Sequence, residues 1–394
     1  MLDLKDSNLL LTATTMSGLE ELLGRELLNL GAREVTPLKR AVSFKGDLGF
    51  IYKANFCLRT AIRILVPVKT FEVQNEDQLY EGIKAMQWEE LMDPSKTLAI
   101  DSSVNSPHFN HTLYVAQKSK DAITDRFRER TGGRPSVDLA DPDLRINIHI
   151  SGTSCIVSID SSGESLHKRG YRREINIAPL NEVLAAGMVL HSGWDKRTNF
   201  IDPMCGSGTL STEAAMYSAN IPPGFFRTGG IEKQKEAFAF MRWKDHDKEL
   251  WQKIFEGSVS KINNNAPLIT ASDVSESVLK KAKKNFQAAK VDDMIRSKYI
   301  AFQKLEKPEG TGTIILNPPY GERMDKDDIL KLYKEIGDTL KKNWSGYTAW
   351  ILTANMEAVN EIGLRATRRI ALFNGSLECK FLKFDLYSGS KKIK

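Results

Sequence analysis

The sequence lacks the patterns that mark several classes of protein. Its four cysteines show no C-x-x-C pair and no histidine at metal-ligand spacing, which argues against a zinc site or a disulfide framework. No apolar run is long enough to span a bilayer. The N-terminus is acidic and has neither the basic start nor the apolar run of a secretory signal. We therefore expect a cytoplasmic protein with buried thiols, no membrane attachment and no required metal.

The bulk composition is that of a folded protein with more than one domain. A chain of 394 residues exceeds one ordinary domain, and 41% hydrophobic with 27% charged residues is typical of globular proteins. The net charge of +6 is compatible with a polyanionic partner, although many metabolic enzymes are as basic.

Two segments concentrate the positive charge. They are residues 118–134 and 167–173, and their basic side chains are Lys118, Lys120, Arg126, Arg128, Arg130, Arg134, Lys168, Arg169, Arg172 and Arg173. Such segments can contact phosphates. Because Asp121, Asp125 and Glu129 are interleaved with the first set, a solvated helix face is an equal alternative.

The first third of the chain predicts alternating strands and helices. Strand patterns at 9–14, 35–44 (two strands broken at Pro37) and 62–66 alternate with helix patterns at 19–30 and 48–58. This β-α-β-β-α-β order resembles a ferredoxin-like module. A helix at 77–86, a strand at 97–104, a long basic helix at 111–130 and a strand pair at 144–150 and 154–159 follow. The polar residues 161–165 are the expected linker.

The remainder predicts a parallel α/β sheet with an unusual end. Strand patterns at 199–201, 268–272, 313–316 and 348–352 alternate with helices. Asn374-Gly375, between strand patterns at 369–373 and 377–386, is a strong hairpin signal. We therefore expect a Rossmann-like sheet whose last strands are antiparallel.

A glycine-rich loop, DPMCGSGT at 202–209, leads from the first of these strands into a helix. Glycines let the backbone approach a ligand, and the helix N-terminus offers free N–H groups. A phosphate-binding P-loop would need lysine after Gly208, and a dinucleotide fingerprint would need glycine where Ser211 stands. The loop thus favours S-adenosylmethionine, with backbone amides for its carboxylate and Asp202 for its ammonium group. A plain strand-turn-helix is the alternative.

Asp273 ends the next predicted strand. Its carboxylate can accept hydrogen bonds from both hydroxyls of a ribose, as acidic residues at this place do in dinucleotide folds. Alternatively, Asp273 caps the helix that follows.

The segment IILNPPYGER at 314–323 predicts a site for an amine. Two prolines end the strand and remove two backbone donors. Acceptors remain at the Asn317 side-chain oxygen and the Pro318 carbonyl, beside the ring of Tyr320. Such a loop suits the exocyclic amine of a base, because the acceptors hold its two N–H bonds while the ring stacks. This chemistry is positioning rather than strong base catalysis. A proline-rich turn is the alternative.

The motifs at 202–209 and 317–323 together resemble the amino-methylating class of S-adenosylmethionine enzymes. Within this class the chain is similar to the THUMP-domain 23S rRNA guanine-N2 methyltransferases, in their form with a single methyltransferase domain. Further matching motifs are RGYR at 169–172, APLNE at 178–182 and FAFMRW at 238–243. VAQKSKDAI at 115–123 resembles the THUMP helix that contacts RNA. The resemblance covers nearly the whole chain.

The resemblance implies an α/β methyltransferase preceded by two α+β modules. These are a ferredoxin-like module at 1–66, a THUMP RNA-binding domain at 67–160 and a Rossmann-like methyltransferase domain at 166–394. It also implies that residues 179–181 lie beside the methionine end of the cofactor. Many relatives carry an acidic residue near the adenine, where this chain has FQKL at 302–305, so we name no adenine contact.

We therefore expect a methyltransferase that forms N2-methylguanosine in 23S rRNA or in an assembly intermediate of the large subunit. The expected catalytic residues are Asn317, Pro318, Pro319 and Tyr320. The expected cofactor-binding residues are Pro179, Asn181, Asp202, Pro203, Cys205, Gly206, Ser207, Gly208, Thr209, Asp273, Val274 and Asn317. The expected RNA-binding residues are Lys118, Lys120, Arg126, Arg130, Arg169, Arg172 and Arg323.

Other substrates remain open at this point. Transfer RNA guanosine is a close alternative, and adenine N6 in DNA or a protein glutamine amide would use the same Asn-Pro-Pro-Tyr loop. The basic N-terminal modules favour RNA over glutamine. A non-catalytic RNA-binding protein would be expected to carry damaged motifs, whereas both glycines, both aspartates and the Asn-Pro-Pro-Tyr loop are intact.

Overall fold

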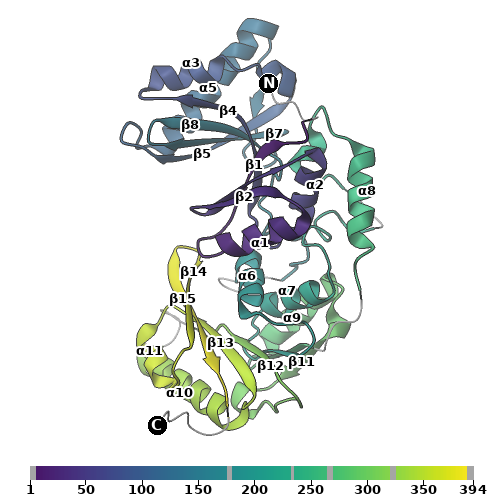
Figure 1. The fold of residues 1–394 in the computed structure, drawn as a ribbon, viewed down its shortest axis with the longest axis vertical. Coiled ribbons are helices and arrows are strands. Elements are labelled where there is room, and N and C mark those ends of the chain that lie inside the picture. Colours follow the sequence, from purple (N-terminus) through teal and green to yellow (C-terminus); the bar gives the residue numbers. More distant parts are fainter. Residues whose placement is uncertain (1–5, 175–179, 232–234, 264–268, 320–324, 388–394) are drawn as a thin grey trace. The chain divides into compact units, whose positions relative to one another are not determined.

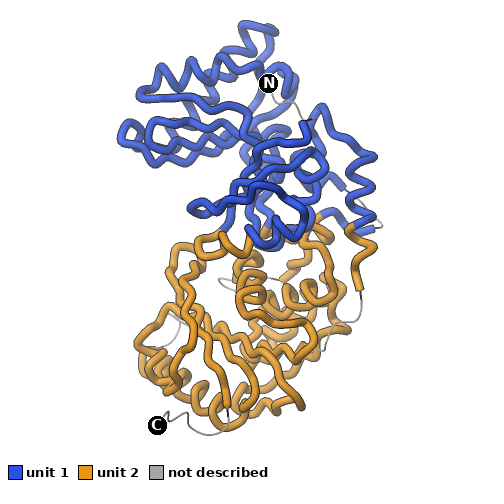
Figure 2. The backbone as a smooth tube through the Cα atoms, in the orientation of Figure 1, with its two compact units in different colours: residues 1–15, 24–166, 228–257 blue, residues 16–23, 167–227, 258–394 orange. Residues whose placement is uncertain are grey.

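The computed structural model describes residues 6–174, 180–231, 235–263, 269–319 and 325–387. The chain forms two compact units (Figure 2). Unit 1 comprises Met1–Thr15, Gly24–Leu166 and Thr228–Gly257, and unit 2 comprises Met16–Leu23, His167–Arg227 and Ser258–Lys394.

The first part of the chain has the expected ferredoxin-like order (Figure 1). Its elements are β1 (Leu9–Thr14), α1 (Glu20–Leu30), β2 (Arg33–Leu38), β3 (Ala41–Gly46), α2 (Leu48–Cys57) and β4 (Arg63–Glu72). The strand break expected at Pro37 is wrong, because Pro37 lies within β2 and pairs with Val42. The chain turns after Leu38, at Arg40 with φ 57°. β2 is an edge strand of its sheet, where the missing N–H of a proline is tolerated.

The next part adds four strands to the same sheet. Its elements are α3 (Glu76–Lys84), α4 (Trp88–Leu91), β5 (Thr97–Asn105), α5 (Thr112–Thr131), β6 (Ser136–Val137), β7 (Leu144–Ser151) and β8 (Ser154–Asp160). The strand order is β2-β3-β1-β4-β8-β7-β5-β6. The beginning of β4 pairs with β1 and the rest of it pairs with β8. The expected boundary between residues 66 and 67 thus lies within a strand that both modules share.

The expected linker at 161–165 begins in the protein interior. Ser161 and Ser162 are fully buried. Asn55 on α2 donates a hydrogen bond to the Ser161 hydroxyl at 2.8 Å and accepts one from the Ser162 hydroxyl at 2.6 Å. These serines therefore tie the end of β8 to α2 instead of forming a solvated connection.

Residues 228–257 return to unit 1, although we expected 166–394 to form one domain. This segment contains the short helix η1 (Ala239–Arg242) and most of α8 (Lys248–Val259). Phe240 stacks on Tyr52 of α2 with ring centroids 4.3 Å apart, and Trp251 lies edge-on to Phe56. Aromatic packing on α2 thus draws this insert away from the unit that precedes and follows it in sequence.

Unit 2 contains the predicted Rossmann-like sheet. Its elements are α6 (Glu182–Ser192), β9 (Asn199–Asp202), α7 (Thr209–Ser218), β10 (Ile269–Asp273), α9 (Glu276–Ala288), η2 (Asp292–Met294), β11 (Ile295–Tyr299), η3 (Phe302–Lys304), β12 (Gly312–Leu316), α10 (Lys326–Asn343), β13 (Tyr347–Thr353), α11 (Met356–Glu361), β14 (Arg368–Asn374) and β15 (Leu377–Asp385). The strand order is β11-β10-β9-β12-β13-β15-β14. The first five strands are parallel, and β15 and β14 complete the sheet as the antiparallel hairpin that Asn374-Gly375 predicts.

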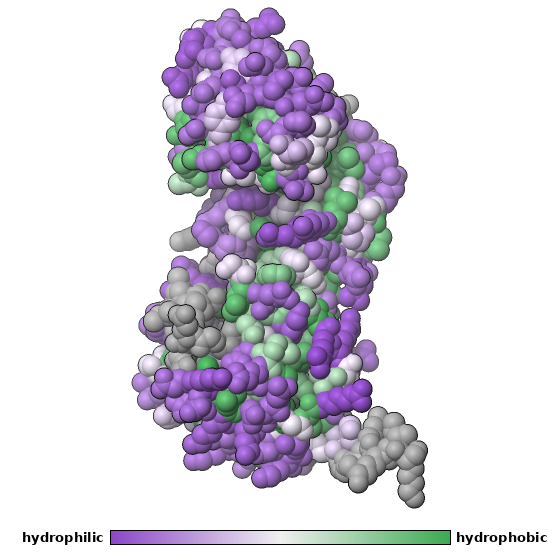
Figure 3. Space-filling model, turned by 90° about the vertical axis from the view of Figure 1, so that its left-hand side faces the viewer, coloured by the Kyte–Doolittle hydropathy of each residue, from purple (hydrophilic) through white to green (hydrophobic). Residues whose placement is uncertain are grey.

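Within the described ranges, no helix is both long and apolar enough to cross a membrane. The face in Figure 3 is mostly hydrophilic, with hydrophobic side chains in smaller groups between polar ones. Among the residues that the structure describes, no three or more His, Cys, Asp or Glu side chains are grouped so that they could hold a metal ion.

Candidate active site

The site lies at the carboxyl ends of the parallel strands of the seven-stranded sheet, where two neighbouring inner strands end. β9 and β12 are adjacent and parallel, but the chain runs from β9 to β10 on one side and from β12 to β13 on the other. The order of strands therefore reverses between β9 and β12. In open α/β sheets, ligands bind outside the carboxyl ends of the strands at such a reversal. The glycine-rich loop follows β9 and Asn317 follows β12.

The glycine-rich loop has two glycines that a larger residue could not replace easily. Gly206 and Gly208 have φ values of 55° and 82°, in the left-handed region. A Cβ atom at Gly208 would lie 2.3 Å from the ring of Phe286, so this glycine allows α7 and α9 to pack closely. A Cβ atom at Gly206 would meet no described atom within 4 Å. The described part of the chain therefore leaves space beside the backbone of Gly206.

The other side chains of this loop are turned into the protein. Pro203, Cys205, Ser207 and Thr209 are all buried. The Cys205 backbone N–H donates to the Ser272 carbonyl of β10 at 2.9 Å, and burial raises the pKa of the Cys205 thiol well above its usual range. These residues therefore shape the loop, and a ligand would reach its backbone rather than their side chains.

Asp202 holds a buried carboxyl group at the end of β9. It is 1% exposed, and its Oδ2 accepts a hydrogen bond from the Ser211 hydroxyl at 2.7 Å. Its Oδ1 has no hydrogen-bond partner within the described residues. Burial raises the pKa of Asp202 to about 7; the Ser211 hydrogen bond opposes this shift and the charge of Asp273 adds to it. A cation placed at Oδ1 would satisfy this oxygen.

Asp273 holds the glycine-rich loop against β10. Its Oδ2 accepts from the Gly206 N–H at 3.0 Å, and its Oδ1 accepts from the Ser275 N–H at 2.9 Å. The helix cap that we considered for Asp273 is formed instead by Ser275, whose hydroxyl accepts from the Val278 N–H. Val274, next to Asp273, is an exposed apolar side chain at 68%. An acidic and an apolar group thus stand side by side where β10 ends.

Asn317 presents a buried acceptor after β12. Its Oδ1 is buried and has no hydrogen-bond partner among the residues described. Pro318, which is buried, and Pro319 follow it and contribute no N–H groups. An unsatisfied buried carbonyl costs free energy, so a ligand donor at this point would stabilise the site. Tyr320, expected to stack on the base, lies outside the described residues.

Two side chains that we did not predict hold the segments around the loop. Asn285 of α9 is 2% exposed, and its Oδ1 accepts from the backbone N–H groups of Arg173 and Glu174 at 2.9 and 3.0 Å. Its Nδ2 donates to the carbonyls of Glu174 and Ser207. Asn285 therefore fastens the segment at 173–174 to the glycine-rich loop. An asparagine on the buried face of an otherwise amphipathic helix was a visible signal for such a role.

Ser211 is the second residue that sequence reasoning missed. It stands in the first turn of α7 and supplies the hydrogen bond to Asp202. A serine in a first helical turn usually serves the helix itself, so its sequence position held no sign of this contact.

Arg169 and Arg172, which we predicted to bind RNA, are used inside unit 2. Arg169 is 2% exposed, with its Nε 3.5 Å from a carboxylate oxygen of buried Glu213. Arg172 forms an ion pair with Glu182 at 2.8 Å and donates to the Thr209 hydroxyl at 3.0 Å. Both guanidinium groups thus have carboxylate partners within unit 2, and their contact with RNA stays a prediction. Arg323 lies outside the described residues.

The long basic helix is only partly available for RNA. Arg126 of α5 is buried and makes a two-pronged ion pair with Glu89, at 2.6 and 2.8 Å. Glu89 therefore holds this guanidinium in place, and the contact of Arg126 with RNA stays a prediction. Arg130 is exposed, whereas Lys120 pairs with Asp121 and the Lys118 ammonium lies 5.2 Å from the ring centre of Tyr80. Lys118, Lys120 and Arg130 remain predicted RNA contacts.

The residues expected beside the methionine end are less fully described. Pro179 lies outside the described residues. Asn181 caps α6, since its Oδ1 accepts from the backbone N–H groups of Val183 and Leu184. Only its amide nitrogen therefore remains for the predicted contact with the cofactor.

Three family models match the chain in succession. They are the RlmL ferredoxin-like domain over residues 10–65, the THUMP domain over 73–160 and the RMKL-like methyltransferase domain over 169–383. The last of these covers more than half of the chain.

Known proteins resemble the chain over nearly its full length. A protein of Synechocystis sp., to which RNA methyltransferase activity is ascribed, is 38% identical over 378 residues, covering 95% of this chain and 96% of that protein. The ribosomal RNA large subunit methyltransferase K/L of Methylococcus capsulatus is 38% identical over 386 residues, covering 95% of this chain. The chain spans 51% of the length of that relative.

A solved structure agrees with the fold. The crystal structure of SMU.472, to which methyltransferase activity is ascribed, is complexed with SAH and is 29% identical. It superposes with a TM-score of 0.85 over 98% of this chain and 100% of that one. The resemblance seen in the sequence is confirmed, and the chain belongs to the RMKL-like methyltransferase family.

Proposed function

We propose that this protein transfers a methyl group from S-adenosylmethionine to the N2 amine of a guanosine in large-subunit ribosomal RNA or its assembly intermediate. The observation that carries the proposal is the buried Oδ1 of Asn317 at the carboxyl end of β12, which has no hydrogen-bond partner among the described residues. An amine hydrogen is the donor that this acceptor lacks. The family membership, the THUMP domain and the name of the K/L relatives support RNA as the substrate.

The residues after β9 and β10 fit the cofactor. S-adenosylmethionine, when bound, supplies a methyl group on a positively charged sulfur. Asp202 would hold its ammonium group, because the Oδ1 of this buried carboxyl has no donor among the residues that the structure describes. Backbone at Gly206 would accommodate the methionine portion, and Asp273 would hold the ribose, with exposed Val274 next to it.

Asn317 and Pro318 would position the substrate amine. The lone pair of a guanine N2 amine is delocalised into the ring, which makes it a weak nucleophile. Two neutral acceptors, the Asn317 Oδ1 and the Pro318 carbonyl, can bind its two hydrogens and orient the nitrogen. Such acceptors are preorganised by the rigid prolines and cost no reorganisation during reaction.

The N-terminal modules would deliver the RNA. We propose the ferredoxin-like module at 1–66, the THUMP domain at 67–160 and the methyltransferase domain at 166–394, with the insert at 228–257 packed back on unit 1. Exposed Arg130 of α5, together with Lys118 and Lys120, would contact phosphates. Their charge makes RNA affinity sensitive to salt.

The proposal is tested by single-turnover transfer of labelled methyl groups to 23S rRNA, followed by mass spectrometry of the nucleosides. The expected product is N2-methylguanosine. N6-methyladenosine would contradict the guanine assignment, and N2-methylguanosine formed only in tRNA would assign the protein to tRNA instead.

A further inference from the structure

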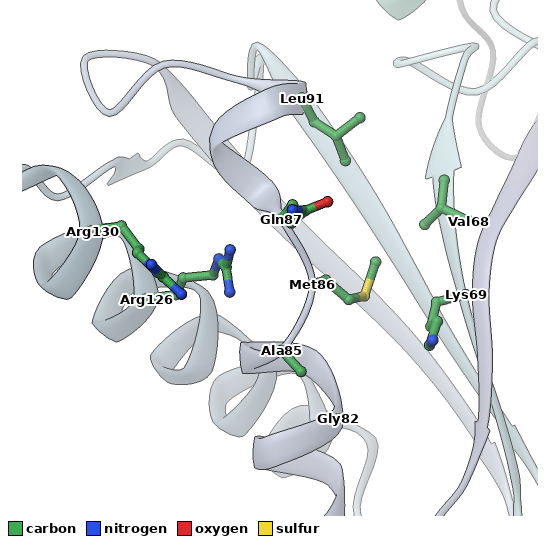
Figure 4. A pocket seen from close by; sticks show the side chains of 9 residues that line it. All are labelled: Val68, Lys69, Gly82, Ala85, Met86, Gln87, Leu91, Arg126 and Arg130. Atoms are coloured by element: carbon green, nitrogen blue, oxygen red, sulfur yellow. The ribbon is translucent and has the colours of Figure 1, made fainter. Parts of the chain in front are cut away.

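Unit 1 contains a pocket of about 340 Å³ that includes no residue of the catalytic site. It lies between the end of α3, α4, the end of α5 and the middle of β4 (Figure 4). Its lining residues are Val68, Lys69, Gly82, Ala85, Met86, Gln87, Leu91, Arg126 and Arg130. None of these is acidic.

A β-bulge shapes the wall that β4 provides. Pro67 pairs with Ser158 and Lys69 pairs with Val157, which leaves Val68 as an extra residue in the strand. Consecutive residues of a regular strand point to opposite faces. Because the bulge changes this direction, Val68 and Lys69 both line the pocket. The irregularity therefore places an apolar group and a cation in one wall.

Two cations in the lining form no ion pair with a described carboxylate. Neither Lys69 nor Arg130 forms an ion pair within the described ranges. Arg126 differs, because Glu89 accepts two hydrogen bonds from its guanidinium. The hydrogen bonding of Arg126 is the largest cause that lowers the pKa of Glu89, and the charge of Arg130 adds a smaller contribution to the same shift. Two cations without an ion-pair partner among the described residues thus stand on opposite walls, next to the planar guanidinium that Glu89 holds.

The pocket is apolar between these cations and offers one polar amide. Val68, Met86 and Leu91 are half-buried and pack against the core of this part of unit 1. The side chain of Gln87 does not cap α4 and has no other partner in the described part of the chain. Figure 4 shows Met86 and Gln87 projecting toward the β4 wall. An amide of this kind can both donate to and accept from a ligand.

We propose that this pocket binds one unpaired nucleotide of the RNA substrate, an inference that rests on the proposed function. The apolar side chains and the fixed Arg126 guanidinium receive the flat base, and Gln87 reads its edge. Lys69 and Arg130 contact the flanking phosphates. A base within a duplex cannot enter, because its faces and edge are covered by its neighbours. A free anion would gain no favourable contact from the apolar side chains of Val68, Met86 and Leu91.

The test compares two probes on the full chain. They are a fluorescent single-stranded RNA of about ten nucleotides, a length typical of single-strand sites, and the same strand annealed to its complement. In the variant Lys69→Ala/Arg130→Ala, single-strand affinity should fall about ten-fold or more, and its log-log salt slope should lose about 1.4, or 0.7 for each lost contact. Duplex affinity should change much less than single-strand affinity, because a paired base cannot enter the pocket and bring its phosphates to Lys69 and Arg130.

A second variant and a matched control separate this pocket from general charge effects. Met86→Trp fills the apolar space without changing charge and should weaken single-strand binding alone. Arg128→Ala removes an exposed arginine of the same helix that pairs with Asp125 outside the pocket, and should leave single-strand binding nearly unchanged. Equal losses for Arg128→Ala, parallel losses for the duplex, or normal binding by Met86→Trp would each overturn the proposal.

The same preparations distinguish this proposal from the proposed function. Wild-type protein is assayed in parallel for methyl transfer to 23S rRNA. Absence of methyl transfer contradicts the proposed function. The oligonucleotide-binding results test the proposed nucleotide pocket independently of methyl transfer.

Discussion

Asp202 should make the affinity for the cofactor depend on pH near neutrality. Burial raises the pKa of this carboxyl to about 7 in the ligand-free protein, so about half of the molecules carry it protonated at that pH. An ammonium group beside Oδ1 favours the charged carboxylate and lowers the pKa in the complex. Binding therefore releases a proton at acidic pH. Affinity should rise as pH rises toward 7 and level off above it.

The size of the effect follows from this pKa. With a pKa of about 7, only about one carboxyl in eleven is ionised one pH unit below, against about ten in eleven one unit above. If only the ionised form binds tightly, SAH affinity falls about ten-fold between about pH 8 and about pH 6. The carboxylate and ammonium groups of the ligand itself do not titrate in this interval.

Titration calorimetry with SAH across this interval, in two buffers of different ionisation enthalpy, measures both affinity and proton release. Release should approach one proton at the acid end and vanish at the alkaline end. Asp202→Asn should bind weakly with no pH dependence. Ser211→Ala removes the hydrogen bond that lowers the pKa of Asp202, so its midpoint should move to higher pH. Constant affinity in the wild type, or an unchanged profile in Asp202→Asn, would refute the reasoning.

Other perturbations follow from the same geometry. Asn317→Ala should lower the methyl-transfer rate about 10²–10³-fold in single-turnover assays while RNA affinity persists, and full activity would remove Asn317 from the site. Gly206→Ala should weaken SAH binding roughly ten-fold or more, because its methyl group enters the open side of the loop. Gly193→Ala is the matched control, because Gly193 is a C-cap with a similar positive φ and no described atom within 4 Å of an added Cβ. This substitution imposes the same backbone strain of about 1–2 kcal/mol, and the variant should bind SAH normally. Asn285→Ala leaves buried backbone groups without partners, which should lower the free energy of unfolding by about 1–3 kcal/mol and weaken SAH binding; unchanged SAH affinity would make Asn285 purely structural. Phe240→Ala removes a fully buried ring that stacks on Tyr52 and should cost about 3–5 kcal/mol in chemical denaturation, whereas a loss below about 1 kcal/mol would mean that the insert is only loosely attached.

The sequence by itself determined the elements whose cause is local. β1 at Leu9–Thr14 has the predicted bounds, and the basic helix expected at 111–130 spans Thr112–Thr131, with His111 as its N-cap and Gly132 as its C-cap. Asn374-Gly375 specified the terminal hairpin. Alternating or helical periodicity, caps and turn residues act over a few neighbours, so they can be recognised without knowing the rest of the chain. β11 was not predicted because IRSKY, at an edge of the sheet, has no such pattern.

Only the tertiary structure decided what each charged side chain does. Arg169 and Arg172 share a basic run with exposed neighbours, yet distant Glu213 and nearby Glu182 neutralise them in the interior. The insert at 228–257 joined unit 1 because Phe240 and Trp251 found aromatic partners on α2, almost two hundred residues earlier in the chain. The raised pKa of Asp202 likewise comes from burial beneath the loop, not from its neighbours in sequence. Burial and pairing depend on contacts between residues far apart in the chain, which periodicity and motif spacing do not encode.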